Sequence, residues 1–260
     1  MEIVICPDVN GVGRTAADSF ERTIQRKPAA VLGLATGSSP LPLYNELERR
    51  SRHGQLSFRE VRAFSLDEYI GLPAEHPETY REVVNREFTT RVDIDPAGVR
   101  GPNGNAPDLE IEAADFERAI TDAGGIDVQV LGVGSNGHIG FNEPGSSLGS
   151  RTRVKTLLPK TRRDNARFFG DPNDVPHHVI TQGIGTIMEA RRIVLMATGE
   201  QKADAIARLV EGPISAMCPG SVLQLHSNTV VILDESAASK LALADYYRYT
   251  YENKPAWQRL

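Results

Sequence analysis

The chain has 260 residues, of which 40% are hydrophobic and 24% are charged, and its formal net charge at pH 7 is −5. This composition is ordinary for a globular protein, and a mildly acidic chain without a Lys/Arg cluster argues against nucleic acid as a partner. No segment approaches the roughly 18 uninterrupted apolar residues of a transmembrane helix, and the N-terminus lacks a signal-peptide pattern. We therefore expect no membrane partner and a cytoplasmic location.

Short apolar runs alternate with amphipathic stretches along the chain. The runs predict strands at residues 2–6, 30–35, 61–66, 127–133, 192–197 and 229–234. Helical spacing of apolar residues predicts helices at 13–27, 41–53, 77–90, 107–123, 200–211 and 235–248. This alternation indicates an α/β fold with a doubly wound, mostly parallel sheet and helices on both faces. No repeat or linker divides the chain, so residues 1–260 are expected to form a single domain.

Polar or glycine-rich segments follow four of the predicted strands, at the sheet edge where such folds bind ligands. The segment TGSSP comes after the strand at 30–35 and before a helix. Backbone N–H groups, hydroxyls and a helix N-terminus together favour a phosphate site. Ser39 before Pro40 is also a good helix cap, and both roles can hold at once. The candidate phosphate ligands in this loop are Thr36, Gly37, Ser38 and Ser39.

Two further segments at this edge carry charged residues. Asp67 in LDEY follows the strand at 61–66, where its carboxylate could act as a general base or simply cap a turn. Lys202 in ATGEQK falls in the first turn of the helix predicted at 200–211. The helix dipole disfavours a cation there, which favours a role in binding an anion, although a solvated lysine is an equal alternative.

The stretch GVGSNGHIGFNEPGS after the strand at 127–133 contains G-x-G-x-x-G, the dinucleotide-binding pattern. Its context excludes that function, because Gly140, Pro144 and Gly145 prevent the helix that should follow. The acid expected about 20 residues further on is also missing, so the fold is Rossmann-like without a dinucleotide site. His138 and Glu143 remain on a glycine-rich loop, where chemistry is favoured over simple capping.

Several motifs together resemble the glucosamine-6-phosphate deaminases of the glucosamine/galactosamine-6-phosphate isomerase family. They include LATGSSPLPLYNEL, FSLDEYIGLPAEHPETY, GVGSNGHIGFNEPGSSLGSRTRVKTL and GEQKADAI, and the resemblance runs from about residue 30 to 235. It implies an enzyme that converts the sugar phosphate glucosamine 6-phosphate and water to fructose 6-phosphate and ammonia. The family needs no cofactor and no metal, in agreement with the absence of metal-ligand spacing among the six histidines and two cysteines.

The resemblance also implies roles for individual residues. Asp67 would move a proton between C2 and C1 through an enol intermediate, and His138 would catalyse opening of the pyranose ring. Glu143 would hold and tune His138 and assist as an acid. The Thr36–Ser39 loop, Arg167 and Lys202 would bind the phosphate. The segment at 153–182 corresponds to the mobile lid of the family.

One residue departs from the pattern of well-studied members, which have Asp where this chain has Asn136. We expect the Asn136 amide oxygen to orient the imidazole, without the charge that would stabilise an imidazolium. Some members are hexamers activated by N-acetylglucosamine 6-phosphate, so the resemblance implies a homo-oligomer. The residues that match the effector site are Ser146, Arg153 and Lys155.

Two other functions remain open. A 6-phosphogluconolactonase-like hydrolase would not need the Asp67 carboxylate for enolisation. A sugar-phosphate-sensing domain of a transcriptional regulator would need a helix-turn-helix segment, for which a chain that opens with a strand at 2–6 leaves no room. The F-N-E-P motif favours the deaminase over the lactonase.

Overall fold

A computed structural model describes residues 1–171, 173–255 and 258. The lid predicted at 153–182 includes residue 172, and the single domain predicted at 1–260 includes 256–257 and 259–260; these residues lie outside the described ones. The lid and the single domain therefore stay predictions.

Seven strands form one sheet in the order β1-β10-β9-β6-β2-β3-β5, and every neighbouring pair is parallel. The predicted parallel sheet is thereby confirmed. Strands β2, β6 and β9 are buried along their whole length, which explains why they read as apolar runs. The strands are β1 (Glu2–Cys6), β2 (Val31–Leu34), β3 (Arg62–Ser65), β5 (Val99–Arg100), β6 (Val128–Leu131), β9 (Ile193–Ala197) and β10 (Thr229–Asp234).

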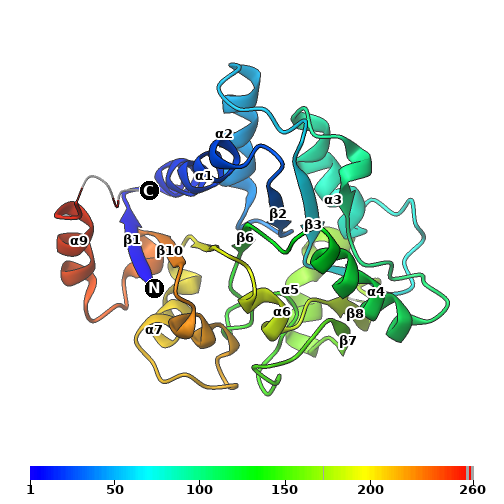
Figure 1. Ribbon diagram of the computed structural model, residues 1–260. Helices are drawn as coiled ribbons and strands as arrows, with labels where there is room; N and C mark the ends of the chain where they lie inside the picture. Colours follow the sequence, from blue (N-terminus) through cyan, green and yellow to red (C-terminus); the bar gives the residue numbers. More distant parts are fainter. Residues whose placement is uncertain (172, 256–257, 259–260) are drawn as a thin grey trace.

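Helices cover both faces of this sheet, as predicted. Figure 1 shows α1 and α2 on one side of it, and α6 and α7 on the other. The α-helices are α1 (Val9–Arg26), α2 (Leu41–Arg52), α3 (Tyr80–Glu87), α4 (Leu109–Asp122), α5 (Pro159–Phe169), α6 (Ile184–Met188), α7 (Ala203–Val210), α8 (Glu235–Ala238) and α9 (Ala244–Glu252). Short 3₁₀ turns are η1 (Thr89–Arg91), η2 (Pro96–Gly98), η3 (Glu200–Lys202) and η4 (Pro219–Leu225).

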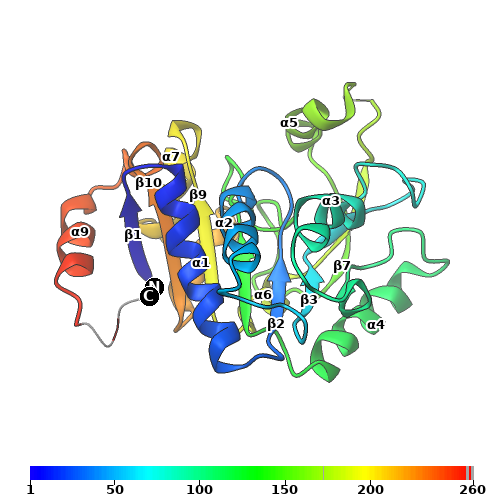
Figure 2. The same ribbon diagram turned by 90° about the horizontal axis from the view of Figure 1, so that it is seen from above.

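A second, three-stranded antiparallel sheet was not predicted from the sequence. It is formed by β4 (Asp67–Tyr69), β8 (His178–Thr181) and β7 (Arg153–Thr156), in the order β4-β8-β7. Tyr69, Phe141 and Val179 belong to a small apolar cluster on it, separate from the main core. Figure 2 shows α5, which connects β7 to β8, beyond the ends of β2 and β3 to which their arrows point.

Helix α1 begins one turn earlier than residue 13, the predicted start. The Asp8 side chain caps it by accepting from the Gly11 N–H at 2.7 Å. Gly13 weakens the helical pattern, but its small size is required by packing, since a Cβ there would lie 2.5 Å from the Pro42 carbonyl oxygen of α2. The Asp108 side chain caps α4, the helix predicted at 107–123, by accepting from the N–H groups of Glu110 and Ile111.

The helix predicted at 235–248 was wrong as a single element, because it divides into α8 and α9. Between them the Glu211 carboxylate accepts from the backbone N–H groups of Ala242 and Leu243 at 2.8 and 2.9 Å. These donors are therefore satisfied outside a helix. Leu241 lies in the core at the same break, which fixes the turn of the chain.

Candidate active site

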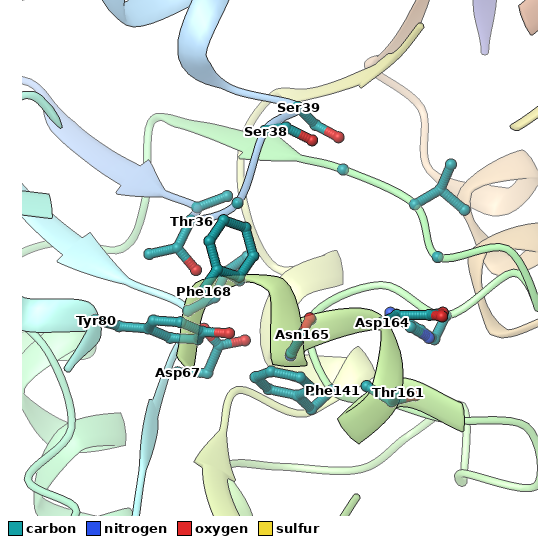
Figure 3. Close-up of a pocket in the computed structure, with 18 of the residues that line it drawn as sticks. Thr36, Ser38, Ser39, Asp67, Tyr80, Phe141, Thr161, Asp164, Asn165 and Phe168 are labelled. Carbon is teal, nitrogen blue, oxygen red and sulfur yellow. The ribbon is translucent and has the colours of Figure 1, made fainter. Parts of the chain in front are cut away.

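The four polar segments predicted to share an edge follow β9, β6, β2 and β3, which are consecutive neighbours in the sheet. Their residues line one cavity of about 490 Å³, which residues of α3 and α5 also line (Figure 3). Asp67 and His138 both line it, together with the loop at 36–39. Residues separated by seventy-one positions therefore face the same space. The other predicted residues that line the cavity are Arg167 and Lys202.

Asp67 is the first residue of β4 and is only 5% exposed. Burial raises the pKa of its carboxyl group to about 8, with a further contribution from the neighbouring Glu68 and a partial offset from a hydrogen bond with Thr181. A carboxyl group with this pKa exchanges a proton near neutral pH. It can therefore act as a general base at a carbon acid.

The capping role left open for Asp67 is taken by its neighbour. Glu68 accepts from the backbone N–H groups of Tyr80 and Arg81 at 2.8 and 3.0 Å, at the start of α3. It also accepts from the N–H of Tyr69 at 2.8 Å. With Glu68 committed to these donors, Asp67 is the one of these two neighbouring carboxyl groups that lines the cavity.

His138 lies on the loop after β6, where the glycines leave room for its ring. A Cβ at Gly134 would lie 2.2 Å from the imidazole, so only glycine fits there. Gly137 has a φ of +90°, a conformation that favours glycine. The Nδ1 atom of His138 lies 3.2 Å from Oε2 of Glu143, and the side chain of His138 is 20% exposed. The carboxylate thus lies within ion-pair distance of one ring nitrogen, and Nδ1 has no aligned hydrogen-bond partner among the described residues.

Glu143 is a firmly ionised carboxylate. Burial alone would raise its pKa, but interactions with His138 and hydrogen bonds from Thr161 and Asn136 outweigh burial and lower the pKa to about 2. The Asn136 Nδ2 group donates to Oε2 of Glu143 at 2.6 Å. Its Oδ1 accepts from the backbone N–H of His138 at 3.2 Å. The expectation that this oxygen orients the imidazole was wrong, because it contacts the backbone and not the ring.

The loop at 36–39 and two cations, Lys202 and Arg167, line a further part of the cavity. Gly37 has a φ of +82°, which turns the chain between β2 and α2. Burial lowers the pKa of Lys202, and the nearby Arg167 lowers it further. Lys202 donates to the Val133 carbonyl oxygen at 2.7 Å. Neither cation forms a salt bridge with a carboxylate among the described residues. This part of the cavity is suited to an anion.

Ser39 does not cap α2. The N-cap position is Pro40, and no side chain there accepts a hydrogen bond from the helix. Ser39 instead lies against the next loop, since a Cβ at Gly132 would come within 2.8 Å of its Oγ. Its position on the cavity lining leaves the hydroxyl available to a ligand. The predicted capping role was therefore wrong.

Sequence reasoning missed the cavity residues of α3 and, apart from Arg167, those of α5. Tyr80 lies next to Asp67 and Thr36 (Figure 3), and its ring stacks on Phe141 with an interplanar angle of 4°. From α5, Asn165 donates to the Tyr69 hydroxyl at 2.9 Å. The ETY stretch before α3 and the helical segment at 159–169 were signals in the sequence. However, neither follows a strand of the parallel sheet, which was the criterion for choosing candidates.

A family model described as glucosamine-6-phosphate isomerases/6-phosphogluconolactonase matches residues 9–232. The chain belongs to this family. Its relatives include two proteins named glucosamine-6-phosphate deaminase. One, from Arthrobacter sp. (strain FB24), is 59% identical over 260 residues and 100% of both chains. The other, from Mycolicibacterium smegmatis, is 58% identical over 259 residues and 99% of both chains.

Two solved structures share the fold of this chain. One described as a monomeric glucosamine-6-phosphate deaminase has a TM-score of 0.90 at 43% identity, covering 92% of this chain and 100% of that chain. A 6-phosphogluconolactonase from Trypanosoma cruzi has a TM-score of 0.73 at 21% identity, covering 93% and 97%. The lactonase therefore shares the fold alone.

In this family member, three predicted effector residues lie away from the cavity. Ser146 is 3% exposed, and its hydroxyl has no hydrogen-bond partner among the described residues. Arg153 on β7 donates to Oδ1 of Asn142 at 3.0 Å, and burial lowers its pKa. Lys155 lies two positions further along β7, so the two cations extend from the same face of the strand.

The described residues form neither a cluster of potential metal ligands nor a membrane-spanning helix. No group of three His, Cys, Asp or Glu side chains within the described part of the chain could hold a metal ion. None of the helices formed by the described residues is long and apolar enough to cross a membrane.

Proposed function

We propose that this enzyme converts glucosamine 6-phosphate and water to fructose 6-phosphate and ammonia. The observation that carries the proposal is that a buried carboxyl group with a raised pKa, Asp67, and an imidazole within ion-pair distance of a carboxylate, His138, line one cavity beside the loop at 36–39. Proton transfer at a carbon next to a carbonyl needs such a base, and ring opening needs a group that moves a proton between two oxygens. The high identity to deaminases over the full chain supports the same reaction.

In the proposed mechanism, the phosphate is the handle that places the reacting carbons. Lys202, Arg167 and the loop at 36–39 bind it, and this remote binding energy orients C1 and C2 at Asp67. His138 moves a proton from the C1 hydroxyl to the ring oxygen, which opens the ring to the aldehyde.

The Asp67 carboxylate then removes the C2 proton, which gives an enol intermediate, and returns the proton to C1. The amino-bearing C2 becomes an imine. Water adds to this carbon, and ammonia leaves as the C2 carbonyl of fructose 6-phosphate forms. The reaction consumes one water and releases one ammonia, and it needs no redox partner, since the isomerisation moves hydrogen within the sugar and hydrolysis of the imine releases the nitrogen.

The test is to mix the purified protein with glucosamine 6-phosphate and measure ammonia and fructose 6-phosphate together. We expect both products in equal amounts. Asp67→Asn and His138→Gln should each reduce turnover by about 10²–10⁴-fold while the fold survives. Hydrolysis of 6-phosphogluconolactone without ammonia release would favour the lactonase alternative, and binding without turnover of either compound would favour a sensing domain. Galactosamine 6-phosphate in the same assay establishes the preferred epimer.

We also propose that N-acetylglucosamine 6-phosphate activates a homo-oligomer, a hexamer by resemblance, at Ser146, Arg153 and Lys155. The unpartnered buried hydroxyl of Ser146 supports this proposal. So does the pairing of Thr181 with Asp67 on one side and Arg153 on the other, which connects β7 to the candidate base. Light scattering and kinetics with and without the effector test it. A monomer with unchanged kinetics, such as the solved monomeric relative suggests, would contradict it. The cytoplasmic location stays a prediction, to be tested by cell fractionation.

A further inference from the structure

Helix α5 contributes one hydroxyl to the carboxylate that holds the imidazole. Thr161, in the first turn of α5, is 5% exposed, and its Oγ1 donates a hydrogen bond to Oε1 of Glu143. Figure 3 shows Thr161 on α5 at the cavity, below Asp164. Thr161 and Glu143 are eighteen positions apart in the sequence. Thr161 was not among the site residues predicted from the sequence.

The two oxygens of Glu143 are held by donors from different elements. Oε1 accepts from Thr161 on α5. Oε2 accepts from Asn136 at 2.6 Å and lies 3.2 Å from Nδ1 of His138, both on the loop after β6. A carboxylate rotates about its terminal bond, and that torsion is broad when nothing holds it. Donors on both oxygens fix its plane, and the plane determines where Oε2 meets the imidazole.

We propose that Thr161 is a positioning residue for the reaction, whose hydroxyl fixes the plane of the Glu143 carboxylate and thereby the orientation of the His138 imidazole. This inference rests on the proposed function, because it assigns His138 the proton transfer of ring opening. Thr161 acts through Glu143 and is not itself a catalytic residue.

The chemistry of the contact requires a hydroxyl at this position. A valine has nearly the same shape, but it would leave Oε1, a buried charged atom, without its donor. The titratable group that faces Glu143 is His138, while Asn136 and Thr161 supply neutral donors. Loss of the Thr161 donor removes one of the interactions that stabilise the ionised form, so the carboxylate becomes both less firmly oriented and easier to protonate.

Other contacts hold α5 against the site, so removal of the Thr161 hydroxyl should leave the helix in place. Lys160 donates to the Ser135 hydroxyl at 2.9 Å, and Asn165 donates to the Tyr69 hydroxyl at 2.9 Å. Arg162 binds the Val175 carbonyl oxygen at 2.8 Å through its Nη2. Unlike the contacts of Lys160 and Asn165, this one joins α5 to the loop that follows it and not to the site. Neither Arg162 nor Val175 lines the cavity, which makes Arg162 a suitable control.

The experiment compares Thr161→Val, Thr161→Ser and Arg162→Met in the ammonia assay. We expect Thr161→Val to lower kcat by about tenfold, the value of one hydrogen bond to a charged group, with KM within about twofold. Thr161→Ser keeps the hydroxyl and should restore kcat to within about threefold of the parent. Arg162→Met changes the same helix without touching Glu143 and should keep kcat within about twofold. Equal losses in Thr161→Val and Arg162→Met, or no rescue by serine, would overturn the inference.

A second readout does not depend on turnover, so it separates this inference from the proposed function. The ionisation of Glu143 can be followed by carbon NMR of selectively labelled protein, assigned with Glu143→Gln. We expect the pKa near 2 in the parent and in Thr161→Ser, and about one unit higher in Thr161→Val. An unchanged pKa in Thr161→Val would overturn the role of the hydroxyl. An absence of ammonia release by the parent would instead refute the proposed function.

Discussion

Asp67→Asn should lower activity and raise stability, because the native fold buries a carboxyl group whose ionised form it disfavours. The pKa of Asp67 in the folded protein is about 8, against its usual 3.8. A raised pKa means that the folded state binds the proton more tightly than the unfolded state. The contribution of Asp67 to stability is therefore complete below pH 3.8 and is lost as the pH rises through about 8.

The size of this loss in stability follows from the pH interval between 3.8 and about 8. Each pH unit within it removes about 1.36 kcal/mol, so on the order of 5 kcal/mol is lost across it, as an upper bound. Asparagine is neutral at every pH and has no such loss. The free energy of unfolding of Asp67→Asn, relative to the parent, should therefore increase by about 2–4 kcal/mol between pH 5 and 8.

Urea unfolding at pH 5, 6, 7 and 8 measures this difference directly. The matched control is Asp127→Asn, another buried aspartate, which forms salt bridges with Lys27 and Arg191 at 2.7 and 3.0 Å. Removal of a paired carboxylate should lower stability at pH 7. If Asp67→Asn and the parent showed the same dependence of unfolding free energy on pH, the burial argument would be refuted. Near-full activity of Asp67→Asn would remove Asp67 from the mechanism.

Three other variants test the remaining parts of the site. Lys202→Ala should raise KM at least about tenfold with a smaller effect on kcat, since it removes a cation from the phosphate end; an unchanged KM would mean that Lys202 is only a surface charge. Gly134→Ala should fold but lower kcat, because its methyl group would displace the His138 ring. Circular dichroism checks the fold and steady-state kinetics check kcat; a normal kcat would contradict the close contact between Gly134 and His138. Asn136→Asp would place a second carboxylate 2.6 Å from Glu143 and should move the acid limb of the kcat profile to higher pH, whereas an unmoved limb would show that the two groups do not interact.

The secondary structure of the main sheet was accessible from the sequence because its signals are local. Strands buried on both faces appear as short apolar runs, and the helix cap Asp108 is followed directly by its helix. The rule that ligands bind at the carboxyl ends of parallel strands then selected Asp67, His138 and Lys202 as candidates. These residues line one cavity because each follows a strand of that sheet.

Features that depend on two distant segments were not accessible in the same way. The antiparallel sheet joins Asp67 to β8 across more than one hundred positions, and short strands such as β4 carry too few residues for a periodic pattern. The division of the last predicted helix depends on Glu211, which reaches the chain from another element.

The amino-acid sequence by itself determined the α/β alternation and the order of the polar loops, because apolar periodicity and glycine-rich turns are properties of neighbouring residues. Only the tertiary structure decided the chemistry of those loops. Burial raises the pKa of Asp67. Asn136 forms hydrogen bonds with Glu143 and with the backbone of His138, and Thr161 donates a hydrogen bond to the Glu143 carboxylate from α5. Ionisation and orientation depend on which groups lie within a few ångströms, and that proximity is set by packing.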